Sequence, residues 1–304
     1  MPNIWTHILF VDELCTRLNR NDLIKTAGPC LHMGAQGPDP FFYHDFWPFK
    51  AGKNVEDVGM KLHTEKCGLV LLDMIERGVS EKNKLQSFIL GFVSHHILDR
   101  QTHPYIHFHS GYEENKHQEL EVLIDTLMLD RYMKKQTWKS PVHKQIKLGG
   151  NRKLISGFMM TVLDQHFPEM MTSYPPGFIE RSYKDMEMAQ RILYDPYGWK
   201  NKWFGEMVSS FSHQPVKGTA DYLNIQRNAW KHAATNEERF ESFLDLYETA
   251  LQEGEQLFHL ILEYWKDLDQ KTFMDIESVV SDISYDTGMP LAEGWQNKWS
   301  EPIV

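Results

Sequence analysis

Apolar side chains at helical spacing run through most of this 304-residue chain, and they limit the fold more than any other feature. In residues 5–19, for example, apolar residues recur every three or four positions, as they do on one face of a helix. The same spacing predicts helices over residues 55–76, 80–99, 113–135, 151–166, 179–194 and 236–268. Alternating strand patterns are nearly absent. We therefore expect an all-α fold in which residues 1–304 form a single multi-helix domain.

Three segments lack this spacing. Residues 28–48 hold many prolines and glycines, which disfavour regular structure, together with more aromatic residues than a solvated linker contains. We expect a packed loop there, which could form one wall of a site. Residues 195–203 and 211–218 are also expected to be loops, and the helix over 236–268 is expected to be broken or bent near Gly254.

The charge balance narrows the range of partners. The chain has 32 basic and 42 acidic residues, a net charge of −10, so we expect no stable binding to nucleic acid. A phosphodiester substrate stays possible, because bound metal cations can invert the local field.

The sequence also indicates in which cellular compartment the protein is expected. The three cysteines have no paired spacing and fit a reducing compartment. The first residues lack a basic region followed by an apolar one, so we expect no signal peptide, and no apolar run reaches the roughly 18 residues of a transmembrane segment. We therefore expect a cytoplasmic protein with no transmembrane segment.

Residues 95–107 hold the densest group of chemically active side chains. Four histidines and one aspartate fall within these thirteen residues. His95 and Asp99 are one helical turn apart, so both side chains can reach one divalent metal ion. Pro104 follows His103 directly, and we expect the helix to end near that point. The pattern favours a metal site. The alternative is that Asp99 only holds a buried imidazole by a hydrogen bond.

Other candidate ligands lie nearby in the sequence. Ten of the fifteen histidines fall within the first 117 residues. His117 and Glu121 repeat the one-turn spacing on the next predicted helix, while His63 and Asp39 come earlier. A set of imidazoles and carboxylates without thiolates favours catalytic over structural zinc, and is also compatible with iron or manganese. We expect the metal-binding half to span about residues 1–135, with additional helices over about 150–304.

Over about residues 3–125, this ordered series resembles the zinc-dependent phospholipase C family. The resemblance is carried by His7, Gly37-Pro38-Asp39, His63, His95-x-x-x-Asp99, His103 and His117-x-x-x-Glu121. The family is an all-α metallo-fold shared with single-strand-specific zinc nucleases and with the catalytic domain of glycosylphosphatidylinositol phospholipase D.

The resemblance implies a ligand set. It implies one zinc held by His63, His95 and Asp99, and a second held by His103, His117 and Glu121. Asp99 would reach towards a third zinc completed by His7. Asp39 would lie beside the metal-bound water, as a general base or a further ligand. Zinc-activated water would then attack phosphorus, with a metal stabilising the leaving oxygen.

Two departures from the family pattern affect this ligand set. In the secreted phospholipases the amine of an N-terminal tryptophan also binds the third zinc, whereas Trp5 is internal here, so only two zincs are expected with a third in question. His103 follows Asp99 after four residues, closer than in the secreted enzymes and nearer to the phospholipase D-like branch. His107 is therefore a second candidate for the ligand assigned to His103.

The sequence thus predicts a metal-dependent phosphoric-ester hydrolase, most like phospholipase C, acting on a phospholipid or another small phosphoester. One alternative is a nuclease or phosphodiesterase of the same fold, and another is a non-catalytic helical metal-binding protein. The adjacent His44-Asp45 suggests a different class of helical metal phosphohydrolase. That class requires the pair on a helix, which the following aromatic residues and Pro48 disfavour.

Overall fold

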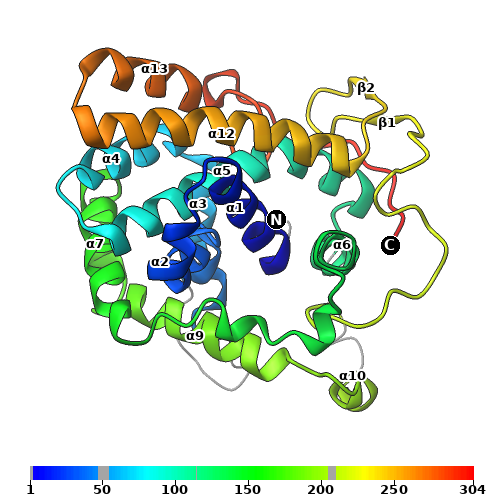
Figure 1. Cartoon of the computed structure of the whole chain (residues 1–304). Helices are drawn as coiled ribbons and strands as arrows, with labels where there is room; N and C mark the ends of the chain where they lie inside the picture. Colours follow the sequence, from blue (N-terminus) through cyan, green and yellow to red (C-terminus); the bar gives the residue numbers. More distant parts are fainter. Residues whose placement is uncertain (1–2, 47–54, 114, 205–209) are drawn as a thin grey trace.

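The computed structural model describes residues 3–46, 55–113, 115–204 and 210–304, and these residues form an all-α fold, as expected. Helices enclose a buried central helix, α5, from several sides (Figure 1). The helices are α1 (Ile4–Arg17), α2 (Asn21–Gly34), α3 (Glu56–Thr64), α4 (Cys67–Gly78), α5 (Asn83–Ser110), α6 (Lys116–Met133), α7 (Arg152–His166), α8 (Pro168–Ser173), α9 (Phe178–Leu193), α10 (Trp199–Phe204), α12 (Phe243–Asp267) and α13 (Gln270–Val280).

Shorter elements join the helices. A 3-10 helix, η1 (Asp39–Tyr43), follows α2, and η2 (Thr137–Lys139), η3 (Val142–Lys144) and η4 (Gly149–Asn151) lie between α6 and α7. A last one, η5 (Leu291–Glu293), follows α13. Two-residue strands β1 (Trp230–Lys231) and β2 (Glu238–Arg239) pair antiparallel. None of the described helices is long and apolar enough to span a bilayer.

Helices α2 and α5 cross with their backbones in close contact. A Cβ atom on Gly91 would lie 2.2 Å from the Leu31 carbonyl oxygen, and one on Gly34 would lie 2.1 Å from the Phe88 oxygen. Any side chain at these two positions would push the helices apart. The residues after α2, which include Asp39, are thereby brought beside the histidines of α5.

The prediction that the helix ends near His103 is wrong. Helix α5 continues through Pro104 to Ser110. Proline lacks an N–H and so cannot bond to the carbonyl of Arg100, four residues earlier. Gly288 packs against that carbonyl, at a distance that leaves no room for a side chain. Because the helix is buried almost throughout, packing on all sides outweighs the local preference against helix before proline. His103 and His107 therefore share a helix with His95 and Asp99.

The expected loop over residues 28–48 is partly wrong. Helix α2 continues through Pro29 to Gly34, with a kink at Ala27, and η1 follows it. Residues 47 and 48 lie outside the described residues. The helix predicted over 55–76 is divided in two by Lys66, whose φ of 53° is left-handed and begins α4.

Three further boundaries differ from the predictions. The helix predicted over residues 80–99 begins only at Asn83, the first residue of α5. The long helix α12 begins at Phe243, after a capping box formed by Ser242 and Asp245, and it continues through Gly254 without a break. A Cβ on Gly254 would lie 2.9 Å from the Leu14 side chain, so the glycine at this position allows α1 to approach α12 closely. Residues 195–203 are not all loop, since α10 begins at Trp199.

The segment after α13 returns along α5 and ends beside its last turn (Figure 1). Arg100 donates to the carbonyl of Val280 at 2.9 Å, and His96 Nε2 lies 2.8 Å from the carbonyl oxygen of Ile283. The backbone N–H of Glu301 donates to the carbonyl of Phe108, which is among the last carbonyls of the helix. The end of the chain is thereby brought close to the histidine-rich face of α5.

Candidate metal centre

The side chains singled out in the sequence converge from five elements. His95, Asp99 and His103 lie on one stretch of α5, and α1, η1, α3 and α6 supply the others. These others are His7, Asp39, His63, His117 and Glu121. All eight are buried except His117, which is partly exposed. Three groups of three donor atoms form among them, each with its atoms within 4.8 Å of one another.

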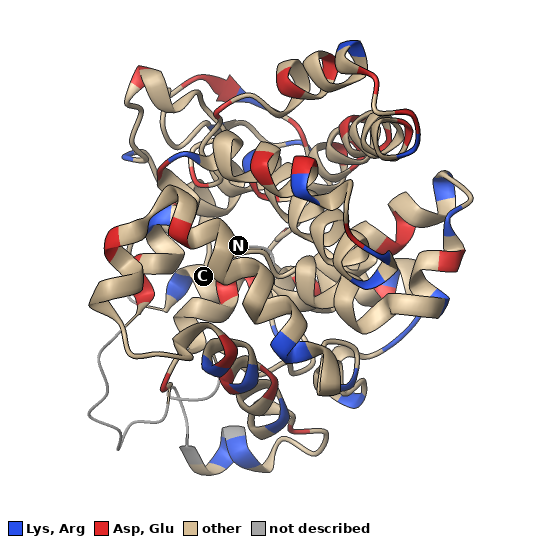
Figure 2. Cartoon of the chain, turned by 90° about the vertical axis from the view of Figure 1, so that its left-hand side faces the viewer, with Lys and Arg blue, Asp and Glu red and all other residues tan. Residues whose placement is uncertain are grey.

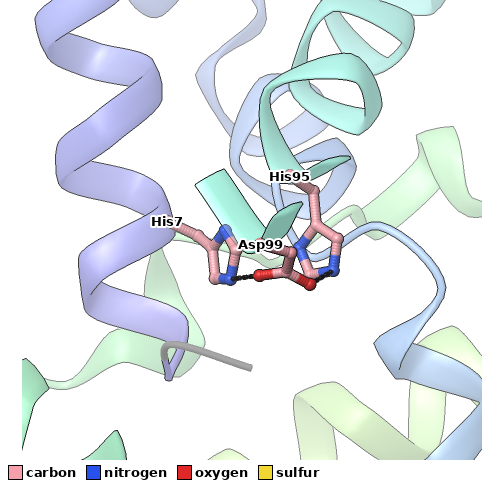
Figure 3. A group of neighbouring side chains, drawn as sticks. All are labelled: His7, His95 and Asp99. Carbon is pink, nitrogen blue, oxygen red and sulfur yellow. Dashed lines mark ion pairs between the residues drawn. The ribbon is translucent and has the colours of Figure 1, made fainter. Parts of the chain in front are cut away.

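The first group joins α1 to α5. Asp99 directs one carboxylate oxygen to each of two imidazoles, with Oδ1 3.3 Å from His7 Nε2 and Oδ2 3.0 Å from His95 Nε2 (Figure 3). The two rings stack with centroids 4.2 Å apart. The one-turn spacing predicted for His95 and Asp99 is confirmed, and His7 closes the group from the neighbouring helix.

The second group shares His95 with the first. Asp39 Oδ1 lies 3.7 Å from His95 Nε2 and 3.6 Å from His63 Nε2. Asp39 comes from η1 and His63 from the last turn of α3. The fold thus brings these two distant positions to His95.

The third group joins α5 to α6. His117 Nε2 lies 2.7 Å from Glu121 Oε1, one turn along α6, and the ring centroids of His117 and His103 are 5.6 Å apart. His103 Nε2 is also 3.7 Å from Asp99 Oδ2, so this group adjoins the first. The three groups thus form one continuous cluster along the face of α5.

A fourth group contains a residue that the sequence analysis missed. His103, His107 and Asp286 also bring one donor atom each within 4.8 Å of one another. Asp286 lies in the segment after α13, far from the histidine-rich region and outside any helical spacing. No local pattern marks it, so only the tertiary structure could find it.

Backbone carbonyls fix the orientation of two of the imidazoles. His95 Nδ1 lies 3.0 Å from the Ala35 carbonyl oxygen, and His63 Nδ1 lies 2.7 Å from that of Gly59. A carbonyl can only accept, so each Nδ1 carries a proton, and in the neutral ring Nε2 then presents a lone pair to the cluster. This is the usual outer-shell arrangement of metal-binding histidines.

Gly37 sets the position of the His95 ring from the other side. Its φ is +49°, a left-handed value, and a Cβ on this residue would lie 2.3 Å from His95 Cδ2. The backbone of Gly37 therefore packs directly on the imidazole, two residues before Asp39. Glycine is required at this position both for its conformation and for the space.

A cation fits this donor set. His103 has no hydrogen-bond partner among the described residues on either ring nitrogen, and Asp99 has none on either oxygen. The same holds for both nitrogens of His7, for His95 Nε2 and for Asp39 Oδ1. Burying polar atoms without partners costs free energy. A divalent cation among these nitrogens and oxygens would satisfy them, and the mixture of imidazole and carboxylate suits zinc.

Burial sets the protonation states that a metal needs. Burial lowers the pKa of His7 to about 4, and burial likewise lowers the pKa of His63 to about 4, so both imidazoles are neutral at pH 7. Neutral imidazole is the form that binds a metal ion. Burial also raises the pKa of Asp39 to about 7, and a neighbouring cation would favour its ionised form.

Asp125 holds α1 in position from α6. This fully buried carboxylate accepts hydrogen bonds from the backbone N–H groups of Trp5 at 2.9 Å and Thr6 at 2.8 Å. His213 Nε2 lies 3.0 Å from it. The bonds satisfy N–H groups in the first turn of α1. They fix the helix start close to His7, and Asp125 itself lies one turn beyond Glu121. No pattern in the sequence singled out Asp125 either.

The adjacent His44 and Asp45 do not join the cluster. His44 Nδ1 lies 3.1 Å from Ser182 Oγ on α9, and Asp45 pairs with Arg181 at 2.5 Å. The two residues follow η1 in a turn rather than lying on a helix. The second class of metal phosphohydrolase therefore lacks the helical pair that it requires.

The fold and the cluster define the class of protein: a helical protein whose central helix gathers histidine and carboxylate donors suited to divalent metal. The family model described as zinc dependent phospholipase C matches residues 6–173. The chain belongs to this zinc-dependent phospholipase C family. The match includes all eight predicted site residues and ends before Asp286. Searches of curated proteins and of solved structures found no match.

Proposed function

We propose that this protein is a zinc-dependent hydrolase of phosphoric esters that resembles phospholipase C in its reaction. The observation that carries the proposal is the convergence of three imidazole–carboxylate groups on α5 in a chain of this family. Zinc ions bound there would supply an activated water nucleophile and positive charge for the phosphoryl oxygens. The same convergence supports metal binding without catalysis, so activity must be tested separately.

The residues that belong to more than one group determine how we divide the donor atoms among the metal ions. His95 has one free nitrogen, Nε2, and can therefore bind one ion, which we assign together with Asp39 and His63. His103, His117 and Glu121 would hold a second ion. The two oxygens of Asp99 allow it to bridge from the first ion towards a third position that includes His7. Two ions are thus proposed, with a third position offered by His7 and Asp99.

Asp39 is proposed as a ligand that also accepts a proton. Its Oδ1 faces both His63 and His95, which leaves Oδ2 to accept a proton from the attacking water. The carboxylate is nearly buried, at 7% exposed, so it can act on a substrate only at the cluster itself. These positions support its role as a general base.

We propose a phospholipid substrate rather than nucleic acid. The chain has a net charge of −10, and acidic and basic residues are interspersed along the described helices (Figure 2). Around α10, by contrast, Tyr197, Trp199 and Trp203 are 83%, 71% and 82% exposed. Exposed tyrosine and tryptophan suit the boundary between lipid and water, because their rings are apolar with one polar group.

The hydrophobic core supports the proposal of one domain. Buried apolar residues of α1 and α5 belong to the same cluster as those of α9 and α12. The two parts expected over about 1–135 and 150–304 thus share a core, which supports residues 1–304 as a single domain. The cytoplasmic location stays a prediction.

A substrate panel tests the proposed function. The full chain is loaded with zinc and assayed on bis(nitrophenyl) phosphate, phosphatidylcholine vesicles and single-stranded DNA, before and after chelation. We expect at least two zinc ions per chain and hydrolysis of the phospholipid that chelator abolishes and zinc restores. Preferred cleavage of DNA would favour the nuclease. One tightly held ion without turnover of any substrate would favour the non-catalytic metal-binding protein. His259→Ala, at an exposed position on α12, is the control.

A further inference from the structure

The segment after α13 brings a carboxylate to the metal centre that the family match does not include. Asp286 Oδ1 lies 2.5 Å from His107 Nε2. Each of these two residues also has a possible metal-ligand atom within 4.8 Å of one on His103. The family match ends at residue 173, so this carboxylate comes from the unmatched part of the chain. It arrives on the side of His103 that neighbours His107.

His103 can supply a ring nitrogen as a metal ligand on this side. The residue is 2% exposed, and neither ring nitrogen has a hydrogen-bond partner within the described part of the chain. His107 lies one turn further along the same helix, with its ring centroid 5.7 Å from that of His103. Two histidines one turn apart on a buried helix present both rings to one point. Asp286 faces that point from the opposite segment.

The carboxylate of Asp286 is held in its orientation by its own segment. Asn297 Nδ2 donates to Asp286 Oδ2 at 3.1 Å and to the Asp286 carbonyl oxygen, also at 3.1 Å. The Asp286 N–H donates to Ser284 Oγ at 3.1 Å. A carboxylate with one oxygen fixed by an amide and the other directed at an imidazole has the support expected of a metal ligand.

The segment itself is fastened beside the cluster. The backbone N–H of Tyr285 donates to the carbonyl of His63 at 3.2 Å, and its ring centroid lies 4.4 Å from that of His96. Gly288, with a φ of +65°, packs against the carbonyl of Arg100 where a side chain could not fit. The position of Asp286 is thus set by contacts with α3 and α5 on either side of it.

We propose that His103, His107 and Asp286 form a further divalent-metal position, which takes zinc as an alternative to His103, His117 and Glu121. The inference deepens the proposed function, since it rests on the metal centre, but it does not depend on hydrolysis. An ion that uses His103 can select either Glu121 on α6 or Asp286 on the C-terminal segment for its carboxylate. An ion bound by Asp286 ties that segment to α5, and firmer docking of the segment must in turn favour that ion.

Zinc stoichiometry in single and double variants tests the proposal. Full-length wild type, Asp286→Asn, Glu121→Gln and the double variant are dialysed against zinc and analysed for metal content. If the two positions are alternatives, each single variant keeps the ion at His103 and the double variant loses one zinc per chain. We expect the zinc affinity of the double variant at the His103 position to fall by more than the roughly 10–100-fold cost of losing an outer-shell partner.

Other outcomes decide against the proposal. If Glu121→Gln alone loses the ion, or if adding Asp286→Asn to it changes nothing, Asp286 serves only as a hydrogen-bond acceptor for His107. Wild type without bound zinc would instead overturn the proposed metal centre as a whole. Wild type that binds zinc without turnover would overturn only the hydrolase.

Hydrogen exchange gives a readout independent of activity and of metal counting. In wild type and in Glu121→Gln, zinc should slow amide exchange in residues 281–304, and in Asp286→Asn this protection should be lost. Glu293→Gln, an exposed position in the same segment, is the matched control and should behave as wild type. Asp286→Glu, which keeps the carboxylate, guards against a folding defect. Equal protection by zinc in wild type and in Asp286→Asn would overturn the proposal.

Discussion

The imidazole rings of His7 and His95 stack with centroids 4.2 Å apart, although one lies at the start of α1 and the other in the middle of α5. Each ring also has one oxygen of Asp99 within 3.3 Å. Two imidazoles and a carboxylate in such close contact would gain from a cation between them. Asp99 is therefore the residue whose replacement should most affect the cluster.

Asp99→Asn should lose at least one metal ion and most of the activity, while the helical fold largely survives. The amide keeps the volume of the carboxylate but removes the charge that would balance the proposed cations, and it would bridge two ions less well. Metal affinity should fall by more than the roughly 10–100-fold cost of an outer-shell change. Elemental analysis and circular dichroism measure the two effects. Full metal occupancy in this variant would mean that Asp99 only orients His95.

Gly37→Ala should weaken zinc binding without touching a ligand. The new Cβ would lie 2.3 Å from the His95 ring, and the left-handed φ of 49° adds about 1 kcal/mol of strain. Because His95 Nε2 must point into the cluster, displacement of the ring should lower zinc affinity by about 10-fold or more. Zinc titration by calorimetry checks this. Gly150→Ala, where a Cβ meets nothing within 4 Å, should bind zinc as wild type does.

Asp125→Asn should destabilise the metal-free protein by about 2 kcal/mol or more, because its buried carboxylate accepts several hydrogen bonds at the start of α1. The amide would direct an N–H group at one of these donors. Since the start of α1 positions His7, zinc affinity should fall as well. Urea denaturation and zinc titration measure the two effects. Asp130→Asn, exposed on the same helix, should change neither, and an unaltered urea midpoint in Asp125→Asn would refute the anchoring role.

The sequence predicts those parts of the site that depend on local geometry. His95 with Asp99, and His117 with Glu121, each lie one turn apart, so helical spacing alone brings them together. The approach of His7, Asp39 and His63 depends on how helices pack, and it was expected only from the resemblance to a family. These three residues do approach α5. Their roles as ligands stay predictions.

Tertiary contacts account for what the sequence could not show. Asp286 reaches His107 because the last segment folds back over α5, and no local pattern encodes that path. The end of α5 was misplaced because Pro104 disfavours a helix only locally, whereas burial on all sides favours its continuation. In both cases contacts distant in sequence decide the structure.

The metal-free protein should lose stability as the pH falls from about 6.5 towards 4. Burial lowers the pKa of His232 to about 4, as it does for His7 and His63, whereas an unfolded histidine titrates near 6.5. Below pH 6.5 the unfolded chain therefore binds more protons than the folded one, so acid favours unfolding. Urea midpoints measured in chelator from pH 8 to 4 test this. Above pH 6.5 these histidines should hardly change the urea midpoint. Below pH 6.5 the midpoint should decrease.

His232→Asn isolates one contribution to this pH dependence. His232 Nδ1 accepts from the N–H groups of Ala234 and Thr235 at 3.2 and 3.3 Å, and the Asn oxygen can replace that acceptor without titrating. The variant should therefore lose less stability than wild type between pH 6.5 and 4. His259→Ala, at an exposed position, should keep the wild-type slope. An identical slope in His232→Asn would show that its burial does not contribute.

The double variant Trp199→Ala/Trp203→Ala should bind phospholipid vesicles less tightly and still hydrolyse a soluble diester at the wild-type rate. Both indoles are largely exposed around α10, so the folded protein loses little packing when they are removed. Losing about 1.4 kcal/mol of apolar transfer energy at the lipid surface lowers partitioning about tenfold. Vesicle cosedimentation and bis(nitrophenyl) phosphate turnover separate the two effects. Phe240→Ala, another exposed aromatic position, should leave both unchanged. Unchanged vesicle binding by the double variant would remove α10 as support for a phospholipid substrate, and the metal centre alone would then remain.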